Sequence, residues 1–366
     1  MNGRNIGIDL LRAVAILTVI ANHWGLSYLS KPSTAWWDEI LRRIGGHGSY
    51  GVTLFFVLSG FLITRTTMKR EPDLFCLSLR GFYLRRIARI QPLFLLAVAF
   101  GAAMLLIGDP SSHPFQDAYR NPKADFTGEF CVSLFSFTNN WERILRDGYW
   151  GLHWDVMWSL AIEEQFYLGF PLLILWAGSK RRLYAALASI VALGVATRIV
   201  GDAQHWGFLA RNMNSLVCFE TLALGALLAL LGERLPHGKR VAPSCLGIGA
   251  LLIGYGFYHG GIAPLIIGAC LFVHGAAYAD IFVDPSWASR GWQAIARIGQ
   301  VSYGMYLIHA TAIYFASPWL GQLPFLLGYA AIVAVAGAIA EISFRYYEAP
   351  MNNWLRGGRR LAAELA

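Results

Sequence analysis

An arginine and a histidine share the first apolar segment of the chain. Arg12 and His23 both lie within residues 7–29. Eleven helical positions make about three turns plus ~20°, so both side chains would project from one face, ~16 Å apart along the axis. A guanidinium suits a phosphate group, and an imidazole suits proton transfer at neutral pH. A membrane-surface arginine and an interfacial, hydrogen-bonded histidine would explain the same pattern without a site.

Two adjacent carboxylates, Glu163 and Glu164, lie in the apolar stretch WSLAIEEQFYLGFP, residues 158–171. Their positions predict a depth similar to that of His23, in the outer half of a helix. Because neighbouring residues point ~100° apart, we expect only one to face a site shared with His23. A carboxylate at that depth needs a water-filled cavity or a cationic partner. The alternative is a structural pair near the membrane surface.

Further candidate residues lie in four other segments. Ser59 and Gly60 are in the middle of residues 48–66, where a glycine permits close approach of a helix or a ligand. A basic run, residues 80–89, contains arginines that can hold phosphates or simply set the membrane orientation: Arg85, Arg86 and Arg89. The last two apolar segments add polar groups with no role assigned by pattern alone: Tyr303, Tyr306, His309 and Glu348.

The composition places all these residues in a membrane protein. Of 366 residues, 56% are hydrophobic and only 14% are charged, against about 25% in a typical globular protein. The mean hydropathy is +0.47. This excludes a soluble enzyme, a secreted disulfide scaffold and a disordered chain. Segments of about 20 apolar residues predict an all-α polytopic membrane protein with ten transmembrane helices, at residues 7–29, 48–66, 85–107, 154–177, 182–200, 214–232, 242–258, 261–279, 297–317 and 323–347.

The basic residues orient these helices. The net charge is +8, and most Lys and Arg residues lie in alternate loops, as the positive-inside rule requires if both termini are cytoplasmic. That distribution argues against nucleic-acid binding. We predict one transmembrane domain over residues 1–350, with a partly helical cap on the outer face at 108–153 and a short basic cytoplasmic tail at 351–366.

Several common catalytic patterns are missing from the sequence. It contains no P-loop, no H-E-x-x-H, no G-x-S-x-G and no histidine followed by an aspartate at the fifth position after it. Nucleotide hydrolysis, zinc proteolysis and the soluble glycerolipid-acyltransferase pattern therefore find no support. The five cysteines are scattered, with no C-x-x-C pair, and predict neither a disulfide framework nor a metal site: Cys76, Cys131, Cys218, Cys245 and Cys270.

Taken in order, the polar segments resemble acyltransferase family 3, the transmembrane enzymes that O-acylate glycans and some small molecules. Arg12, ten residues and His23 match its R-x10-H signature. FFVLSGFLI, RRIARIQPLF, WSLAIEEQFYLGFP, SYGMYLIH and the terminal E-x-P of Glu348 and Pro350 match further blocks, from residue 7 to residue 350. Larger members carry an additional SGNH domain, for which we expect no room in this chain.

The resemblance implies an acyl-CoA donor, most often acetyl-CoA, and an acceptor hydroxyl on a glycan or lipid-linked sugar. It also implies a bacterial inner (plasma) membrane location and no metal. It makes Arg12 and His23 essential, with other site residues at Ser59, Gly60, Arg85, Arg86 and Glu163. An exopolysaccharide or lipopolysaccharide sugar is the favoured acceptor; O-antigen, peptidoglycan, a nodulation-type oligosaccharide and macrolides stay open.

These inferences combine into a mechanistic hypothesis. Arg12 and the cluster Arg85, Arg86 and Arg89 would hold CoA phosphates, while the pantetheine arm spans the ~16 Å to His23. His23 would act as general base, oriented by Glu163 or Glu164; a covalent acyl-histidine is the variant. A proton-coupled transporter that uses the same buried residues is the alternative from another class. A membrane-bound O-acyltransferase of the other large family is a second enzyme alternative.

Overall fold

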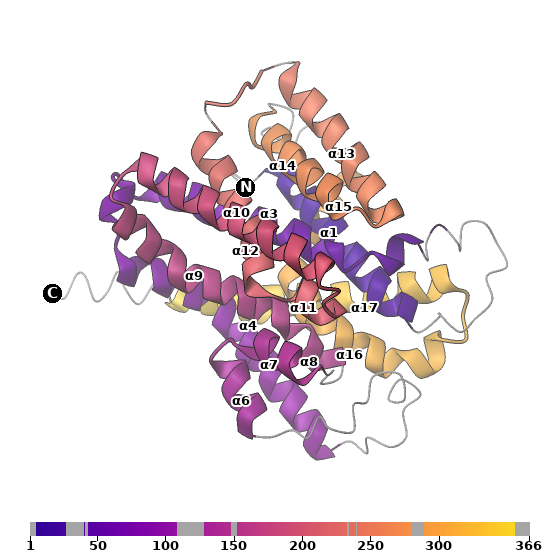
Figure 1. Cartoon of the computed structure of the whole chain (residues 1–366). Helices are drawn as coiled ribbons and strands as arrows, with labels where there is room; N and C mark the ends of the chain where they lie inside the picture. The colour runs from indigo at the N-terminus through magenta and orange to yellow at the C-terminus, as the bar shows by residue number, and fades with distance from the viewer. Residues whose placement is uncertain are drawn as a thin grey trace.

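The computed structural model describes residues 5–26, 40, 43–107, 128–147, 152–232, 234–238, 240–279 and 289–355. Within these ranges every regular element is a helix (Figure 1). Much of the predicted outer cap, residues 108–127 and 148–151, lies outside the described residues, as does most of the predicted tail, residues 356–366. The described part of the cap forms three short helices: α6 (Gly128–Phe135), α7 (Asn139–Arg146) and α8 (Leu152–Asp155).

Each of the ten predicted spans corresponds to a helix: α1 (Ile6–Leu26), α3 (Tyr50–Arg70), α4 (Leu79–Ile107), α9 (Met157–Ala177), α10 (Lys180–Ala203), α12 (Ser215–Leu231), α13 (Val241–His259), α14 (Ile262–Tyr278), α16 (Ser302–Leu320) and α17 (Phe325–Ser343). By length and apolar composition, eight of the described helical segments can cross a membrane. The other two predicted spans are α14, with 17 residues, and α16. The fold is therefore an all-α polytopic membrane protein. The cytoplasmic location of both termini stays a prediction.

The ninth predicted span differs from the structure at its start. The sequence places that start at residue 297, but residues 290–300 form a separate helix, α15 (Arg290–Gln300), and α16 begins at Ser302. A Cβ on Gly299 would lie 1.8 Å from the carbonyl oxygen of Asp9, so α15 packs its backbone directly on α1. This contact and the break at Val301 bring the amino-terminal end of α16 close to α1.

Three smaller helical pieces complete the description. A short 3-10 helix, η1 (Leu74–Cys76), follows α3, and α11 (Phe208–Asn212) precedes α12. After α17 the chain continues through a π-helical turn, η5 (Phe344–Glu348), which carries the predicted site residue Glu348. Single π-helical turns inside longer helices are rare and often occur at functional sites.

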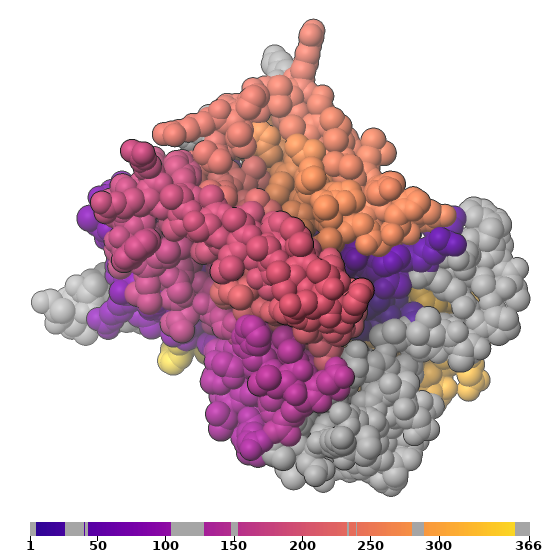
Figure 2. All heavy atoms as spheres, viewed as in Figure 1, coloured from indigo at the N-terminus to yellow at the C-terminus, as the bar shows by residue number. Residues whose placement is uncertain are grey.

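Helix α1 lies in the interior, where it contacts α3, α15 and α16. The pair α13 and α14 packs together at one side, and α3 packs on α12 (Figure 1). The space-filling view shows α10 and α11 across the middle of one face, with α13 and α14 on one side and α6 and α7 on the other (Figure 2). This arrangement puts the polar residues of α1, α3, α9 and α16 in the centre.

A close contact between α3 and α12 depends on two glycines. A Cβ on Gly60 would lie 1.9 Å from the carbonyl oxygen of Leu222, and a Cβ on Gly225 would lie 2.1 Å from that of Val57. No side chain fits at such distances, so the backbones of the two helices touch. The structure thus supports the packing interpretation of Gly60.

A buried polar network holds α9 against its neighbours. The Gln165 side chain donates to Phe137 O at 2.6 Å and to Asn140 Oδ1 at 2.9 Å, and it accepts from the Ser215 hydroxyl at 2.6 Å. Asn140 in turn donates to the carbonyl of Met213 at 3.0 Å. Because these polar groups satisfy one another, they fix α9 in depth and rotation, and with it the adjacent carboxylates.

Candidate functional site

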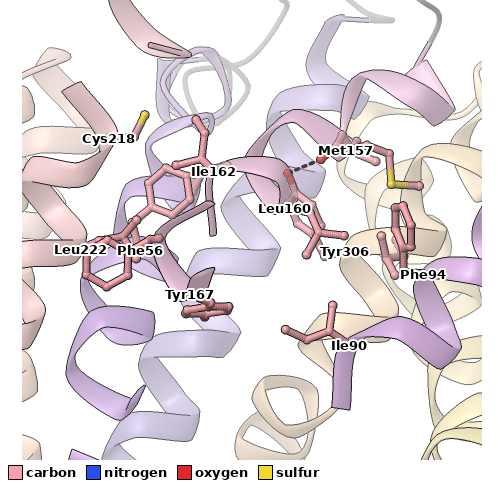
Figure 3. Packing of buried hydrophobic residues seen from close by; sticks show 14 of the residues in the cluster. Phe56, Ile90, Phe94, Met157, Leu160, Ile162, Tyr167, Cys218, Leu222 and Tyr306 are labelled. Atoms are coloured by element: carbon pink, nitrogen blue, oxygen red, sulfur yellow. Dashed lines mark hydrogen bonds between the residues drawn. The ribbon is translucent and has the colours of Figure 1, made fainter. Parts of the chain in front are cut away.

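A cavity of about 850 Å³, counted with its open mouth, lies between α1, α3, α4, α9 and α16. Its polar lining combines cations, one carboxylate and hydroxyl groups: Arg12, Arg86, Arg89, Glu163, Ser59, Ser159, Tyr167, Ser302, Tyr303 and Tyr306. The rest of its wall is apolar. Figure 3 labels five residues of the whole wall, three apolar ones and two of the tyrosines: Phe56, Ile90, Leu160, Tyr167 and Tyr306. We call this space the central cavity.

Glu163 is the carboxylate of the central cavity, and hydroxyl groups from two helices fix it. The Ser59 hydroxyl of α3 donates to Oε1 at 2.7 Å, and the Tyr167 hydroxyl, one turn along α9, donates to Oε2 at 3.1 Å. Both carboxylate oxygens are therefore held in one orientation. Their negative charge faces a cavity that Arg12 and Arg89 also line.

A second cavity adjoins the first, and its lining is mainly basic and polar: Thr66, Thr67, Arg70, Phe82, Arg85, Arg86 and Arg89. We call it the basic cavity. Arg86 and Arg89 line both cavities, so the two cavities are neighbours. The guanidinium of Arg86 lies over the Tyr167 ring, 5.3 Å from its centroid. Arg85 forms an ion pair with Glu71 at 3.1 Å, so part of its charge is already balanced.

The hydrogen-bond partner of His23 is a second histidine. Nδ1 of His23 lies 2.8 Å from Nε2 of His309 in α16, and the two rings are stacked with an interplanar angle of 16°. The His309 side chain is fully buried, and its Nδ1 lies 2.7 Å from the carbonyl oxygen of Tyr306. A neutral imidazole has one donor and one acceptor nitrogen, so one ring of the pair donates this hydrogen bond and the other accepts it.

Tyr306 separates the histidine pair from the central cavity. Its ring lines the cavity, and its centroid lies 5.7 Å from that of the His309 ring. Its hydroxyl lies 2.6 Å from the Ser159 hydroxyl and donates to Val156 O at 3.0 Å. In space, the polar groups thus form a row that runs from the basic cavity along the central cavity to Tyr306, and then to His309 and His23.

The structure brings together most of the residues that the sequence indicates. Arg12, Ser59, Arg86, Arg89, Glu163 and Tyr303 line the central cavity, and Arg85 lines the basic cavity. Tyr303 also donates to the carbonyl of Ile90 at 2.9 Å, which ties α16 to α4. Within the described residues there is no cluster of three His, Cys, Asp or Glu side chains that could hold a metal ion.

Apart from the histidine pair, three predicted site residues line neither cavity. Gly60 faces α12. Glu164 is not part of the cavity wall, and its Oε1 is buried without a hydrogen-bond partner among the described residues. Glu348 accepts a 3.2 Å hydrogen bond from Ser343, and it lies against Gly304 of α16. Adjacent Glu163 and Glu164 therefore point in different directions, as their ~100° separation predicts.

One expectation needs correction. The sequence places Glu163 and Glu164 at the depth of His23, with one of them as the group that orients its ring. In the structure Glu163 bonds with Ser59 and Tyr167, and His309 contacts His23 instead. The residue of α9 beside Tyr306 is Ser159, one turn nearer the start of the helix. Glu163 therefore lies farther from the histidine pair than the sequence suggested.

Sequence reasoning missed several residues of the site. Tyr167 could have been found, because it follows Glu163 by four positions and shares its helix face. Ser302 lines the central cavity at the first residue of α16, and its buried hydroxyl has no partner among the described residues. His153 lies 2.5 Å from the Thr311 hydroxyl, two residues beyond His309, and no spacing in the sequence predicts that contact.

The fold and this site define a polytopic membrane protein with an arginine-lined intramembrane cavity that leads to a histidine pair. The chain belongs to acyltransferase family 3: the model of that family, described as an acyltransferase domain, matches residues 5–341. No solved structure matches the chain.

Three bacterial proteins show how this chain relates to the family. It is 28% identical to O-acetyltransferase OatA of Staphylococcus aureus strain NCTC 8325, over 94% of this chain and 57% of OatA. It is 25% identical to “Putative peptidoglycan O-acetyltransferase YrhL” of Bacillus subtilis strain 168, over 94% of this chain and 54% of YrhL. It is also 28% identical to “Putative O-acetyltransferase SACOL0978” of S. aureus strain COL, over 94% of this chain and 56% of that relative. The chain thus spans a little over half the length of these relatives.

Proposed function

We propose that this protein is a membrane-embedded O-acyltransferase that moves an acyl group, acetyl in the simplest case, from acyl-CoA to a hydroxyl of a cell-envelope glycan. The observation that carries the proposal is that the two cavities are neighbours. Arg86 and Arg89 line both a basic cavity and a mainly apolar one that Arg12 also lines. Such an arrangement suits a donor with an anionic head and a long uncharged arm.

Acyl-CoA has this chemistry. Its phosphate groups need cations and hydrogen-bond donors, and arginine supplies both in a planar fork. The unpartnered Ser302 hydroxyl and the amino-terminal end of α16 add donors at the wall of the central cavity. The pantetheine arm is uncharged and flexible, which fits walls made of Phe56, Ile90 and Leu160. The donor would enter from the side of Arg70 and Arg85, which the positive-inside rule assigns to the cytoplasm.

The reaction takes place at His23. The imidazole removes the proton of the acceptor hydroxyl while the oxygen attacks the thioester carbonyl carbon. The carbon–sulfur bond then breaks, and the sulfur takes the proton back from His23. The products are an ester and CoA with a free thiol, so the histidine is regenerated and atoms and charge balance.

Tyr306 lies between the central cavity and the histidine pair in this structure. The acyl end must therefore pass the Tyr306 ring, which the Ser159 hydroxyl and the Val156 carbonyl hold in place. In the covalent variant the acyl group forms a bond with a His23 nitrogen before the acceptor arrives. The two routes differ in whether acyl-enzyme accumulates when acceptor is withheld.

The acceptor is proposed by class. The family resemblance implies an acceptor hydroxyl. OatA is named an O-acetyltransferase, and YrhL is named a “Putative peptidoglycan O-acetyltransferase”. We therefore propose a glycan of the bacterial cell envelope as the acceptor, with peptidoglycan joining the exopolysaccharide and lipopolysaccharide sugars that the sequence favours. The enzyme would work in the plasma membrane, on a glycan at the opposite side from the donor.

Proteoliposomes test the proposal against transport. Purified protein is reconstituted, acetyl-CoA is supplied outside, and free CoA thiol is measured with and without glycan fragments. The proposal predicts thiol release that increases with acceptor and acetyl ester on the glycan. Loss of thiol release in His23→Ala vesicles supports a role for this residue. Proton or solute flux without any acyl-CoA turnover would support the transporter alternative and refute the proposal.

A further inference from the structure

The two histidines of the site have different surroundings. His309 is fully buried, and its Nδ1 faces two backbone carbonyl oxygens: that of Tyr306 at 2.7 Å and that of Met305 at 3.2 Å. A carbonyl oxygen can only accept a hydrogen bond, so the His309 Nδ1 carries a hydrogen. Within the described residues no carboxylate contacts either ring, and an unpaired charge in such a place is costly. A neutral His309 therefore has its lone pair on Nε2.

This lone pair determines the tautomer of the other ring. Nε2 of His309 lies 2.8 Å from Nδ1 of His23. Two lone pairs cannot form a hydrogen bond, so His23 must donate from Nδ1. A neutral His23 then has its lone pair on Nε2. That nitrogen has no hydrogen-bond partner among the described residues, and the His23 side chain is only partly buried.

From this chain of donors and acceptors we infer that His309 is a positioning residue, which fixes His23 in the tautomer whose Nε2 is the atom that takes the acceptor proton. The inference rests on the proposed function and deepens it by naming the reacting nitrogen. A carboxylate holds the histidine in many hydrolases. Here a second, neutral imidazole anchored on backbone carbonyls does so, and the stacked rings restrict rotation of His23.

Two substitutions separate this role from simple packing. His309→Gln can place an amide oxygen where Nε2 lies, so it can still accept from His23 Nδ1. His309→Leu fills similar space without an acceptor. We expect kcat of His309→Gln to stay within about 10-fold of the wild-type value, and kcat of His309→Leu to fall at least about 100-fold, the scale of general-base catalysis. The KM for acetyl-CoA should change by less than about 3-fold in both, because His309 does not line the donor cavity.

A spectroscopic measurement tests the tautomer without any turnover. The chain contains nine histidines, and 15N solid-state NMR of histidine-labelled protein in lipid, with a His23→Gln difference spectrum, isolates the two His23 nitrogens. The wild type should show a protonated Nδ1 and an unprotonated Nε2. In His309→Leu the other tautomer should become populated. His309→Gln should keep the wild-type pattern.

The outcomes distinguish failure of this inference from failure of the proposed function. A wild-type His23 protonated at Nε2 would overturn the inference, even if acyl transfer is observed and even if His309→Leu does not fold. A folded His309→Gln that is as inactive as His309→Leu would also overturn it. Absence of turnover by the wild type with any acyl-CoA would refute the proposed function, while the NMR result would still decide the tautomer.

Discussion

Ser59 of α3 donates a 2.7 Å hydrogen bond to Glu163 of α9, inside the central cavity. The bond joins two helices that are far apart in the sequence and turns the carboxylate toward the space that Arg12 and Arg89 line. In the proposed enzyme this carboxylate balances the arginine charges before the donor phosphates arrive, so its orientation affects how the donor is seated.

Replacement of Ser59 tests this relationship. Ser59→Ala leaves one oxygen of Glu163 without its donor, and hydrogen bonds to charged groups contribute about 1.5–3 kcal/mol. We expect kcat/KM for acetyl-CoA to fall about 10-fold or more, while the protein keeps its wild-type elution and thermal unfolding. Ser244→Ala is the control, because Ser244 is exposed and bonds only with its own helix. An unchanged kcat/KM in Ser59→Ala would contradict this role of the hydrogen bond.

Gly60, the next residue, should behave differently, because it packs on α12. The added methyl of Gly60→Ala would lie 1.9 Å from the carbonyl oxygen of Leu222, so α3 and α12 must separate. We expect a large drop in the yield of folded protein and in its thermal midpoint. Gly169→Ala in α9 is the matched control, because nothing lies within 4 Å of its Cβ. Because alanine has a higher helix propensity than glycine, we expect the free energy of unfolding of Gly169→Ala to equal that of the wild type or to exceed it by up to about 1 kcal/mol. Wild-type stability in Gly60→Ala would refute the packing interpretation.

Arg12 should act mainly on the donor. It lines the central cavity, and a charge-assisted hydrogen bond to phosphate is worth about 1.5–3 kcal/mol. We therefore expect Arg12→Gln to weaken acetyl-CoA binding roughly 10- to 100-fold, as measured by titration calorimetry in detergent. Arg181→Gln, an exposed arginine at the start of α10, serves as control and should bind like the wild type. Wild-type affinity of Arg12→Gln with lost turnover would refute the assignment to the donor.

An ion pair within the apolar helices should contribute to stability and leave the chemistry unaffected. Arg198 of α10 and Glu220 of α12 lie 3.1 Å apart, and neither lines the central cavity. Glu220 is buried and Arg198 is partly buried. Glu220→Gln leaves this guanidinium without its counter-charge, which costs up to about 3 kcal/mol. We expect a lower thermal midpoint but wild-type kcat per folded molecule.

The double variant Arg198→Leu and Glu220→Leu should recover most of the lost stability, since both charges are removed together. Asp202→Asn is the control, because Asp202 pairs with Arg211 at an exposed position and such pairs contribute about 0–1 kcal/mol. A Glu220→Gln variant with the midpoint of the wild type would contradict the stabilising role, and a large loss of kcat would place the pair in the catalytic apparatus.

Much of the fold could be predicted because a bilayer leaves few solutions. Apolar runs of about 20 residues must become helices, and all ten predicted spans correspond to helices in the structure. The predicted start of the ninth span at residue 297 was wrong, because residues 297–300 belong to α15 and α16 begins at Ser302. The break at Val301 depends on the contact of Gly299 with Asp9, which lies almost three hundred residues away in the sequence.

The candidate site was predictable where one helix carries the information. Arg12 and His23 share α1, and the spacing alone places them on one face. Contacts between helices were not predictable in this way. The bonds of His23 with His309 and of Ser59 with Glu163 depend on relative depth and rotation, which packing and buried networks such as that of Gln165 determine. No local pattern in a single sequence reports the relative depth and rotation of two helices.

The measurement that tests the proposed enzyme most directly compares the wild type with His23→Ala in detergent, using acetyl-CoA and longer acyl-CoAs. Binding is measured by calorimetry, and slow hydrolysis by release of the CoA thiol. The proposal predicts that acetyl-CoA binds both proteins with similar affinity, because His23 does not line the donor cavity. It also predicts that thiol release disappears in His23→Ala. A wild type that binds no acyl-CoA, or a His23→Ala variant that hydrolyses acetyl-CoA at the wild-type rate, would contradict it.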